Sequence, residues 1–133
     1  MSASEIRKTN EAQVRELIES WARAVRARDI DGILKNHAPE MLLFDVPLPV
    51  QSKGIEAYRQ SWDVFFRWFG ESGVFELSEL TITAGDDVAF AHGLIRCTGS
   101  DANALTVRLT IGCRKIDGEW TIVHEHHSEP SSD

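Results

Sequence analysis

The sequence predicts one α+β domain, covering residues 1–133, in which N-terminal helices pack against a curved antiparallel sheet that encloses a pocket. Apolar residues recur at helical spacing as far as Phe69, and four long β-rich segments joined by short turns follow Gly73. A chain of 133 residues is long enough for one sizeable core and too short for two. These observations predict both the fold class and the domain count.

Two helices are expected near the start of the chain. The first covers 4–28, where Ser4 can cap the start and apolar residues recur every three or four positions. The second is a short helix over 30–37, with Asp29 as its expected cap and Pro39 as its stop. Each helix should bury one apolar face.

The next segment combines a short strand, a proline loop and an aromatic helix. Residues 41–45 predict a strand, whereas 46–54 cannot be regular because two prolines remove backbone donors. Residues 55–69 predict a helix that ends at Gly70. Its buried face carries Tyr58, Trp62, Phe65, Phe66 and Phe69.

The C-terminal half predicts an antiparallel meander. Strand-forming segments cover 74–83, 88–98, 105–116 and 120–128, and each connection has turn chemistry. Long strands twist, so the sheet should curl around the helices and hold a cavity on its concave side. The aromatic helix face suits that cavity to a flat apolar ligand.

Charge and composition exclude several classes of partner. A net charge of −7 argues against nucleic acid, which requires clustered Lys and Arg. No apolar run approaches the ~20 residues needed to span a bilayer, so no membrane partner is expected. Cys97 and Cys113 lie in apolar strands without redox or metal spacing, and we therefore expect a cytoplasmic location.

Three of the five histidines lie in the last predicted strand. Alternation places His124 and His126 on the same face as Trp120. Glu125 and His127 share the opposite face. We place the face with Trp120 inward because large apolar side chains need burial. An imidazole in a dry pocket can act as a general acid or base.

A metal site is the alternative reading of these histidines. His124 and His126 could chelate a metal, with His92 of an earlier strand as a third ligand. The spacing matches no specific zinc motif, so we expect neither a metal nor another cofactor.

Four short segments carry a family resemblance. They are Arg-Asp-Ile-Asp-Gly-Ile at 28–33, Phe-Asp-Val-Pro at 44–47, Gly-Ile-Glu-Ala-Tyr-Arg at 54–59 and Gly-Glu-Trp-Thr-Ile at 118–122. In this order they resemble the ketosteroid isomerase-like and SnoaL-like branch of the nuclear transport factor 2-like superfamily, over nearly the whole chain. The resemblance implies a cone-shaped curved antiparallel sheet on N-terminal helices, a small-molecule ligand and a homodimer.

The resemblance also implies roles for single residues. In ketosteroid isomerases the general base is an Asp nine residues before the glycine that opens the next helix, and Asp45 and Gly54 reproduce that spacing. The Tyr and the protonated Asp that stabilise the oxyanion in those enzymes correspond to Trp21 and Thr110 here, so the resemblance does not extend to the oxyanion donors of steroid isomerases. The same alignment turns Trp62 and His92 toward the pocket.

The last strand receives two conflicting assignments. The amphipathic pattern turns His124 and His126 inward, whereas an alignment without gaps favours Val123, Glu125 and His127. We follow the pattern, although a β-bulge would satisfy both.

A homodimer is also expected from the sequence itself. One face of the strand over 105–116 carries Leu105, Val107, Leu109 and Ile111, which are too apolar to leave exposed. The opposite face carries Arg108, which either meets an anion in the pocket or lies in solvent.

The expected function is a cofactor-independent acid/base enzyme, of isomerase, cyclase or dehydratase type, acting on a small apolar carbonyl-containing or polyketide- or steroid-like compound. The alternatives are a non-catalytic ligand-binding protein and a dimeric association module. The candidate catalytic residues are Asp45, His92 and His126. The candidate ligand-binding residues are Trp21, Phe44, Trp62, Phe66, Phe90, Arg108, Thr110 and His124.

Overall fold

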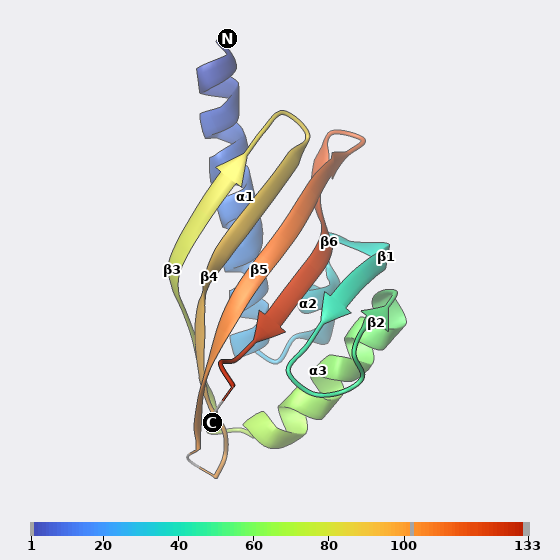
Figure 1. Ribbon diagram of the computed structural model, residues 1–133, viewed down its shortest axis with the longest axis vertical. Helices are drawn as coiled ribbons and strands as arrows, with labels where there is room; N and C mark the ends of the chain where they lie inside the picture. Colours follow the sequence, from blue (N-terminus) through green and yellow to red (C-terminus); the bar gives the residue numbers. More distant parts are fainter. Residues whose placement is uncertain (1, 102, 132–133) are drawn as a thin grey trace.

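The computed structural model describes residues 2–101 and 103–131. Within them the elements are α1 (Ala3–Arg26), α2 (Ile30–Leu34), β1 (His37–Phe44), β2 (Ser52–Lys53), α3 (Ile55–Phe69), β3 (Val74–Ala84), β4 (Val88–Thr98), β5 (Ala104–Ile116) and β6 (Glu119–Ser128). The helices lie on one side of a curved sheet, with α1 behind the long strands and α3 beside β1 and β2 (Figure 1). The predicted fold class is therefore confirmed.

The sheet has the strand order β2-β1-β6-β5-β4-β3. Strands β3 to β6 form the predicted antiparallel meander. β1, however, pairs with β6 in parallel, so the sheet is mixed rather than wholly antiparallel. The two strands are joined through a helix and four further strands rather than through a hairpin, and this long connection permits the parallel pairing.

The helix boundaries differ from the prediction near the N-terminus. Ser2 rather than Ser4 caps α1, because its side chain accepts a hydrogen bond from the backbone N–H of Glu5. Asp29 caps α2 as expected, but the chain becomes extended at Lys35 and continues into β1. α3 has the predicted bounds.

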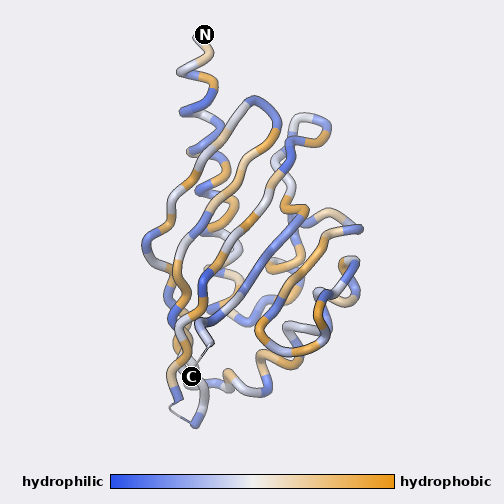
Figure 2. Tube along the Cα trace, viewed as in Figure 1, coloured by the Kyte–Doolittle hydropathy of each residue, from blue (hydrophilic) through white to orange (hydrophobic). Residues whose placement is uncertain are grey.

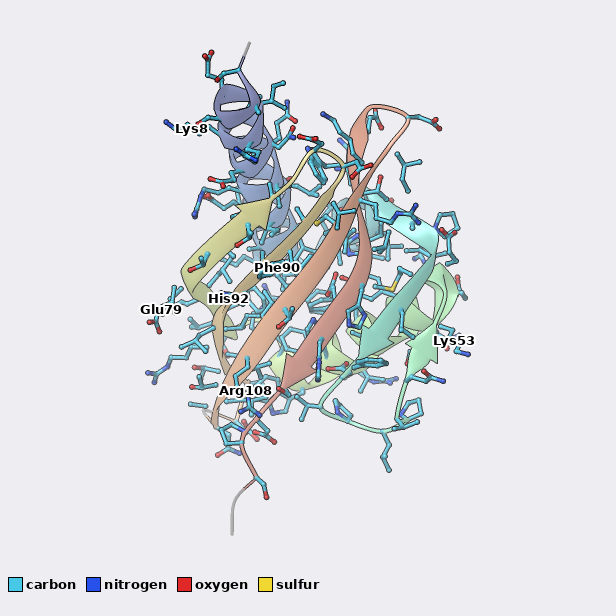
Figure 3. All side chains as sticks on the ribbon, turned by 45° about the horizontal axis from the view of Figure 1, so that its top comes forward. Lys8, Lys53, Glu79, Phe90, His92 and Arg108 are labelled. Carbon is cyan, nitrogen blue, oxygen red and sulfur yellow. The ribbon has the colours of Figure 1, made fainter. Side chains whose placement is uncertain are left out.

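The first half of the inner face of β4 is made of small side chains, contrary to expectation. Ala89 and Ala91 are buried, whereas Phe90 is 49% exposed and His92 is exposed. α1 packs against the neighbouring strand β3 and leaves little depth beneath the sheet, which small residues accommodate. The inward placement of Phe90 and His92 is therefore wrong, and Figure 3 labels both on the open side of the sheet.

The inner face of β5 is the apolar one. Val107, Leu109 and Ile111 are buried within this chain, while Arg108 and Thr110 are exposed on the outer face. Hydrophobic and hydrophilic residues accordingly alternate along the strands in Figure 2. The apolar face that was the reason to expect a dimer is covered by the helices of the same chain, so that argument is wrong.

A β-bulge in β6 reconciles the two assignments of the last strand. Ile122 pairs with Cys113 and His124 pairs with Gly112, which leaves Val123 as an extra residue. The extra residue shifts the alternation by one position. Trp120 and Ile122 therefore face inward at the start of the strand, and Glu125 and His127 face inward near its end, as the burial of these residues shows. The inward placement of His124 and His126 is wrong.

Candidate active site

A cavity of about 290 Å³ lies between α3, the inner face of the sheet and the start of the loop after β1. Its aromatic wall consists of Trp62, Phe65, Trp68 and Phe75. Its sheet wall consists of Ile95, Cys97, Leu105 and Val107. Asp45, Ser61 and His127 supply its polar side chains. The cavity is thus apolar with a polar end, which is the usual construction of a small-molecule site.

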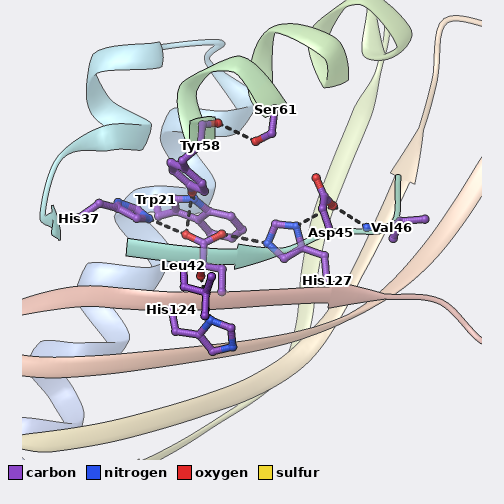
Figure 4. Close-up of polar contacts among 10 residues, drawn as sticks. Trp21, His37, Leu42, Asp45, Val46, Tyr58, Ser61, His124 and His127 are labelled. Carbon is purple, nitrogen blue, oxygen red and sulfur yellow. Dashed lines mark hydrogen bonds and ion pairs between the residues drawn. The ribbon is translucent and has the colours of Figure 1, made fainter. Parts of the chain in front are cut away.

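Behind that polar end lies a carboxylate with no exposed surface, that of Glu125. The Tyr58 hydroxyl donates to its Oε2 at 2.6 Å, and His37 Nε2 lies 2.5 Å from the same oxygen. His127 Nε2 lies 2.9 Å from the other oxygen, Oε1. These three partners come from α3, β1 and β6, and Figure 4 shows them converging on the carboxylate. A buried charge needs such a complete set of partners.

Tyr58 is itself held by α1. The Trp21 indole N–H donates to the Tyr58 hydroxyl oxygen at 2.9 Å, and both side chains are buried. Burial, and then the neighbouring charge of Glu125, raise the pKa of Tyr58 well above its ordinary value. Tyr58 therefore remains a neutral donor to Glu125.

His127 lies between two carboxylates. Its Nε2 faces Glu125, and its Nδ1 lies 3.3 Å from Asp45 Oδ1. Burial favours the neutral ring, but hydrogen bonds to Asp45 and Glu125 and their charges outweigh it and raise the pKa of His127 to about 9. The ring is therefore an imidazolium at neutral pH, with an N–H group on each nitrogen.

The charge of Glu125 is stabilised by the same contacts. Burial alone would raise its pKa, but hydrogen bonds from His127 and His37, and the charges of these rings, lower it to about 2. Glu125 is consequently ionised throughout the physiological range. Its role here is to hold His127 in one orientation and in its charged form.

Asp45 is the last member of the series Glu125, His127 and Asp45, and it lies at the cavity. Its Oδ1 accepts from the Val46 backbone N–H at 2.8 Å and forms an ion pair with His127, whose Nδ1 lies 3.3 Å away. Among the described residues, none donates a hydrogen bond to its Oδ2. The side chain is 26% exposed, compared with 11% for His127. Asp45 therefore combines a fixed carboxylate with one oxygen available to a ligand.

Two of the predicted site residues line the cavity, and two more lie directly behind its wall. Asp45 and Trp62 line it. Trp21 is buried behind Trp62, with ring centroids 5.9 Å apart. Phe66 packs against Trp62 at 5.9 Å, outside the lining.

The other predicted site residues lie on the outer face of the sheet. Phe44 packs there against His124 and His126, with ring centroids 4.9 and 5.4 Å apart. Arg108 meets Ser128 there, with Nε 3.2 Å from Oγ. The prediction that these residues line the pocket is wrong, because the alternation of each strand turns their side chains away from the cavity. The residues concerned are Phe44, Phe90, His92, Arg108, Thr110, His124 and His126.

The network residues that the sequence reasoning missed or turned the wrong way are His37, Tyr58, Glu125 and His127. Tyr58 was expected on the buried face of its helix but without a polar partner. The gapless alignment favoured Glu125 and His127 over the amphipathic pattern. His37 meets Glu125 across 88 positions of the chain, and no local pattern could have indicated that contact.

The remaining polar and sulfur groups add no reactive centre to the cavity. Burial raises the pKa of the Cys97 thiol to about 12, so it is a poor nucleophile. Within 2–101 and 103–131, no group of three or more His, Cys, Asp or Glu side chains is arranged to hold a metal ion. No helix in the described part of the chain has the length and apolar character needed to cross a membrane.

Comparison with known proteins identifies the family and the fold of the chain. The family model of the SnoaL-like domain matches residues 14–132. The structure is similar to that of a nuclear transport factor 2-like protein of unknown function from Pseudomonas putida KT2440, at 38% identity and a TM-score of 0.88, covering 94% of this chain and 89% of that one.

Two more distant structures share the fold. A ketosteroid isomerase-like protein from Erwinia carotovora atroseptica SCRI1043 is 16% identical, with a TM-score of 0.73 and coverage of 92% of this chain and 97% of that one. A protein of unknown function with a cystatin-like fold from Nostoc punctiforme PCC 73102 is 20% identical, with a TM-score of 0.75 and coverage of 90% and 91%. None of the curated proteins compared matches the chain.

Proposed function

Because this chain belongs to the SnoaL-like domain family, and because its apolar cavity ends in a carboxylate paired with an imidazolium, we propose that it is a cofactor-independent acid/base enzyme. Its substrate is a small apolar carbonyl compound, and its reaction is of the isomerase, cyclase or dehydratase type. The observation that carries the proposal is the series Asp45, His127 and Glu125, which runs from the cavity to the core.

Asp45 is the base in this proposal. Its Oδ2 removes a proton from the carbon next to the carbonyl group, and the electron pair of that C–H bond moves onto the carbonyl oxygen. His127 Nδ1–H, held loosely by Asp45 at 3.3 Å, shifts toward that oxygen and donates to it. In isomerisation the carbonyl group re-forms and the proton on Asp45 passes to a different carbon. In dehydration the carbonyl group re-forms, the C–O bond of a β-hydroxyl breaks, and that oxygen takes the Nδ1 proton of His127 and departs as water. The proton on Asp45 then passes to His127 Nδ1, which restores both groups.

Glu125 supports this step without touching the substrate. It keeps His127 charged and oriented, so the acid is in place before the substrate binds. His127 replaces His92 and His126 as the proposed catalytic histidine, because those two side chains lie on the other face of the sheet.

The test is proton exchange in D₂O, followed by ¹H NMR on cyclohexenone and β-tetralone. The wild-type protein should accelerate exchange of the proton next to the carbonyl group by about 10² to 10⁴-fold. Asp45→Asn keeps the shape of the side chain but cannot take a proton, so the acceleration should be lost. Asp87→Asn, in an exposed turn, is the matched control and should exchange like the wild type.

A non-catalytic binding protein is the second candidate. The aromatic lining of the cavity favours it, since four rings would hold a flat ligand without any chemistry. Saturable binding of both ketones with the same exchange rate in wild type and Asp45→Asn would decide for binding and against catalysis.

We also propose that the chain forms a homodimer through the outer face of the sheet. Val88 is 58% exposed and Phe90 is 49% exposed on that face, and Phe44 packs beside two histidines there. Light scattering on the wild type should give twice the chain mass, and Phe90→Glu should give the chain mass by placing a charge in the interface. A monomeric wild type at micromolar concentration would reject this proposal.

We place the protein in the cytoplasm. Cys97 and Cys113 are buried free thiols on the inner face of the sheet, which suits a reducing compartment.

A further inference from the structure

The polar end of the cavity presents hydrogen-bond acceptors to a ligand. Asp45 Oδ2 accepts from none of the described residues. The Ser61 hydroxyl donates to the Tyr58 carbonyl at 2.6 Å, which leaves its lone pairs for a ligand. Both N–H groups of His127 already face carboxylates. At these three side chains a ligand that donates hydrogen bonds finds free acceptors, whereas one that only accepts requires His127 Nδ1–H to turn away from Asp45.

The charged groups around the opening of the cavity favour a positively charged ligand. A shallow cleft adjoins the cavity at Asp45 and His127, and it is also lined by His126 and Glu129. Among the described residues, no Lys or Arg lines either the cavity or this cleft. The charge of His127 is offset by Glu125 behind it. The field at the opening therefore favours a cation, as does the net charge of −7.

The apolar end can hold the body of a cation as well as that of a neutral compound. Trp62 and Phe65 meet at 80° with ring centroids 5.2 Å apart, and Phe65 and Phe75 meet at 84° at 6.3 Å. Rings set nearly at right angles form the corner of a box rather than a flat stack. Such a corner accommodates a rounded hydrocarbon body whose polar group lies at Asp45.

We propose that the cavity binds a small apolar ammonium ion. The ammonium group donates to Asp45 Oδ2, and the hydrocarbon body fills the space among Trp62, Phe65 and Phe75. This inference goes beyond the proposed reaction, because it requires the carboxylate of Asp45 as a charge and not as a base. Such an amine would also occupy the place of a carbonyl substrate.

Three compounds with the same hydrocarbon body test the inference. They are adamantan-1-amine, adamantan-1-ol and adamantane-1-carboxylate, and calorimetric titration at neutral pH measures their affinities. The amine should bind about tenfold more tightly than the alcohol, since a partly desolvated ammonium gains a charge-assisted hydrogen bond to the carboxylate. The carboxylate should bind most weakly, because Asp45 repels it.

Two variants test whether the preference for the amine over the alcohol depends on the side chain of Asp45. In Asp45→Asn the amine and the alcohol should bind within about threefold of each other, because the charge is gone and the shape remains. Asp87→Asn should keep the wild-type preference. Equal affinities of amine and alcohol in the wild type, tighter binding of the carboxylate, or no binding of the amine would each overturn the inference.

The outcome is separable from that of the proposed reaction. Amine binding that depends on Asp45, without any proton exchange of the ketones, would leave this inference standing and reject the enzyme. Exchange that depends on Asp45, without inhibition by the amine, would leave the enzyme standing and reject this inference.

Discussion

The two faces of β6 carry the same kinds of side chain in opposite surroundings. On the inner face Glu125 and His127 are enclosed, and every polar atom of the carboxylate has a partner. On the outer face His126 is exposed beside the ring of Phe44. His126 and His127 are neighbours in the chain, yet only His127 is held between carboxylates.

The difference depends on a single residue of backbone. Val123 is the extra residue of the bulge, and it reverses the alternation of everything that follows it in the strand. Without it, the pattern that buries Trp120 and Ile122 would also bury His124 and His126. Burial therefore places one pair of residues in the candidate site and leaves the other pair on the outer face.

Deletion of Val123 is expected to have the largest effect. It would turn Glu125 and His127 to the outer face and His126 to the inner face, so the loss of stability should exceed about 4 kcal/mol. Val123→Ala keeps the backbone length and should cost no more than about 1 to 2 kcal/mol. Urea denaturation measures both. A deletion variant as stable as Val123→Ala would mean that the bulge does not determine which face is buried.

Replacement of Glu125 should come next. Glu125→Leu leaves His37, His127 and Tyr58 without their common acceptor, at a cost of about 3 to 5 kcal/mol in the free energy of unfolding. His126→Leu, the matched change on the outer face, should alter that free energy by about 0.5 kcal/mol or less. Similar values for the two variants would show that the buried network is not a stabilising unit.

The dependence of stability on pH should show a smaller effect with a defined sign. The pKa of His127 is raised from 6.5 to about 9 in the folded chain, so its contribution is complete below pH 6.5 and lost as the pH rises through 9. The pKa of Glu125 is lowered from 4.5 to about 2, so its contribution is complete above pH 4.5 and lost as the pH falls through 2. Both contributions are therefore complete between pH 4.5 and 6.5.

Variants on the two faces of β6 should differ in how their melting temperature depends on pH. His127→Gln should remove most of the decline in melting temperature above pH 6.5, because the titrating ring is gone. His126→Gln should keep the wild-type profile. Parallel profiles for wild type and His127→Gln above pH 6.5 would show that His127 is not held charged by its neighbours.

Local sequence signals determined most of the elements. The aromatic periodicity and the flanking glycines predicted α3 with its observed bounds, and β-forming composition with turn residues predicted β4 with its observed bounds. The motifs around Asp45 and Gly54 indicated the family, which the family model confirms. They also placed Asp45 next to the cavity, because the end of a strand and the start of a helix are local features.

Only the tertiary structure decided which face of each strand is inside. Alternation separates two faces but does not say which one the helices cover, so Phe90 and His92 were turned the wrong way. The contact of His37 with Glu125, and the parallel pairing of β1 with β6, join parts of the chain that share no local pattern. The candidate site consists of such contacts, since a buried carboxylate must collect its partners from whichever elements the fold brings to it.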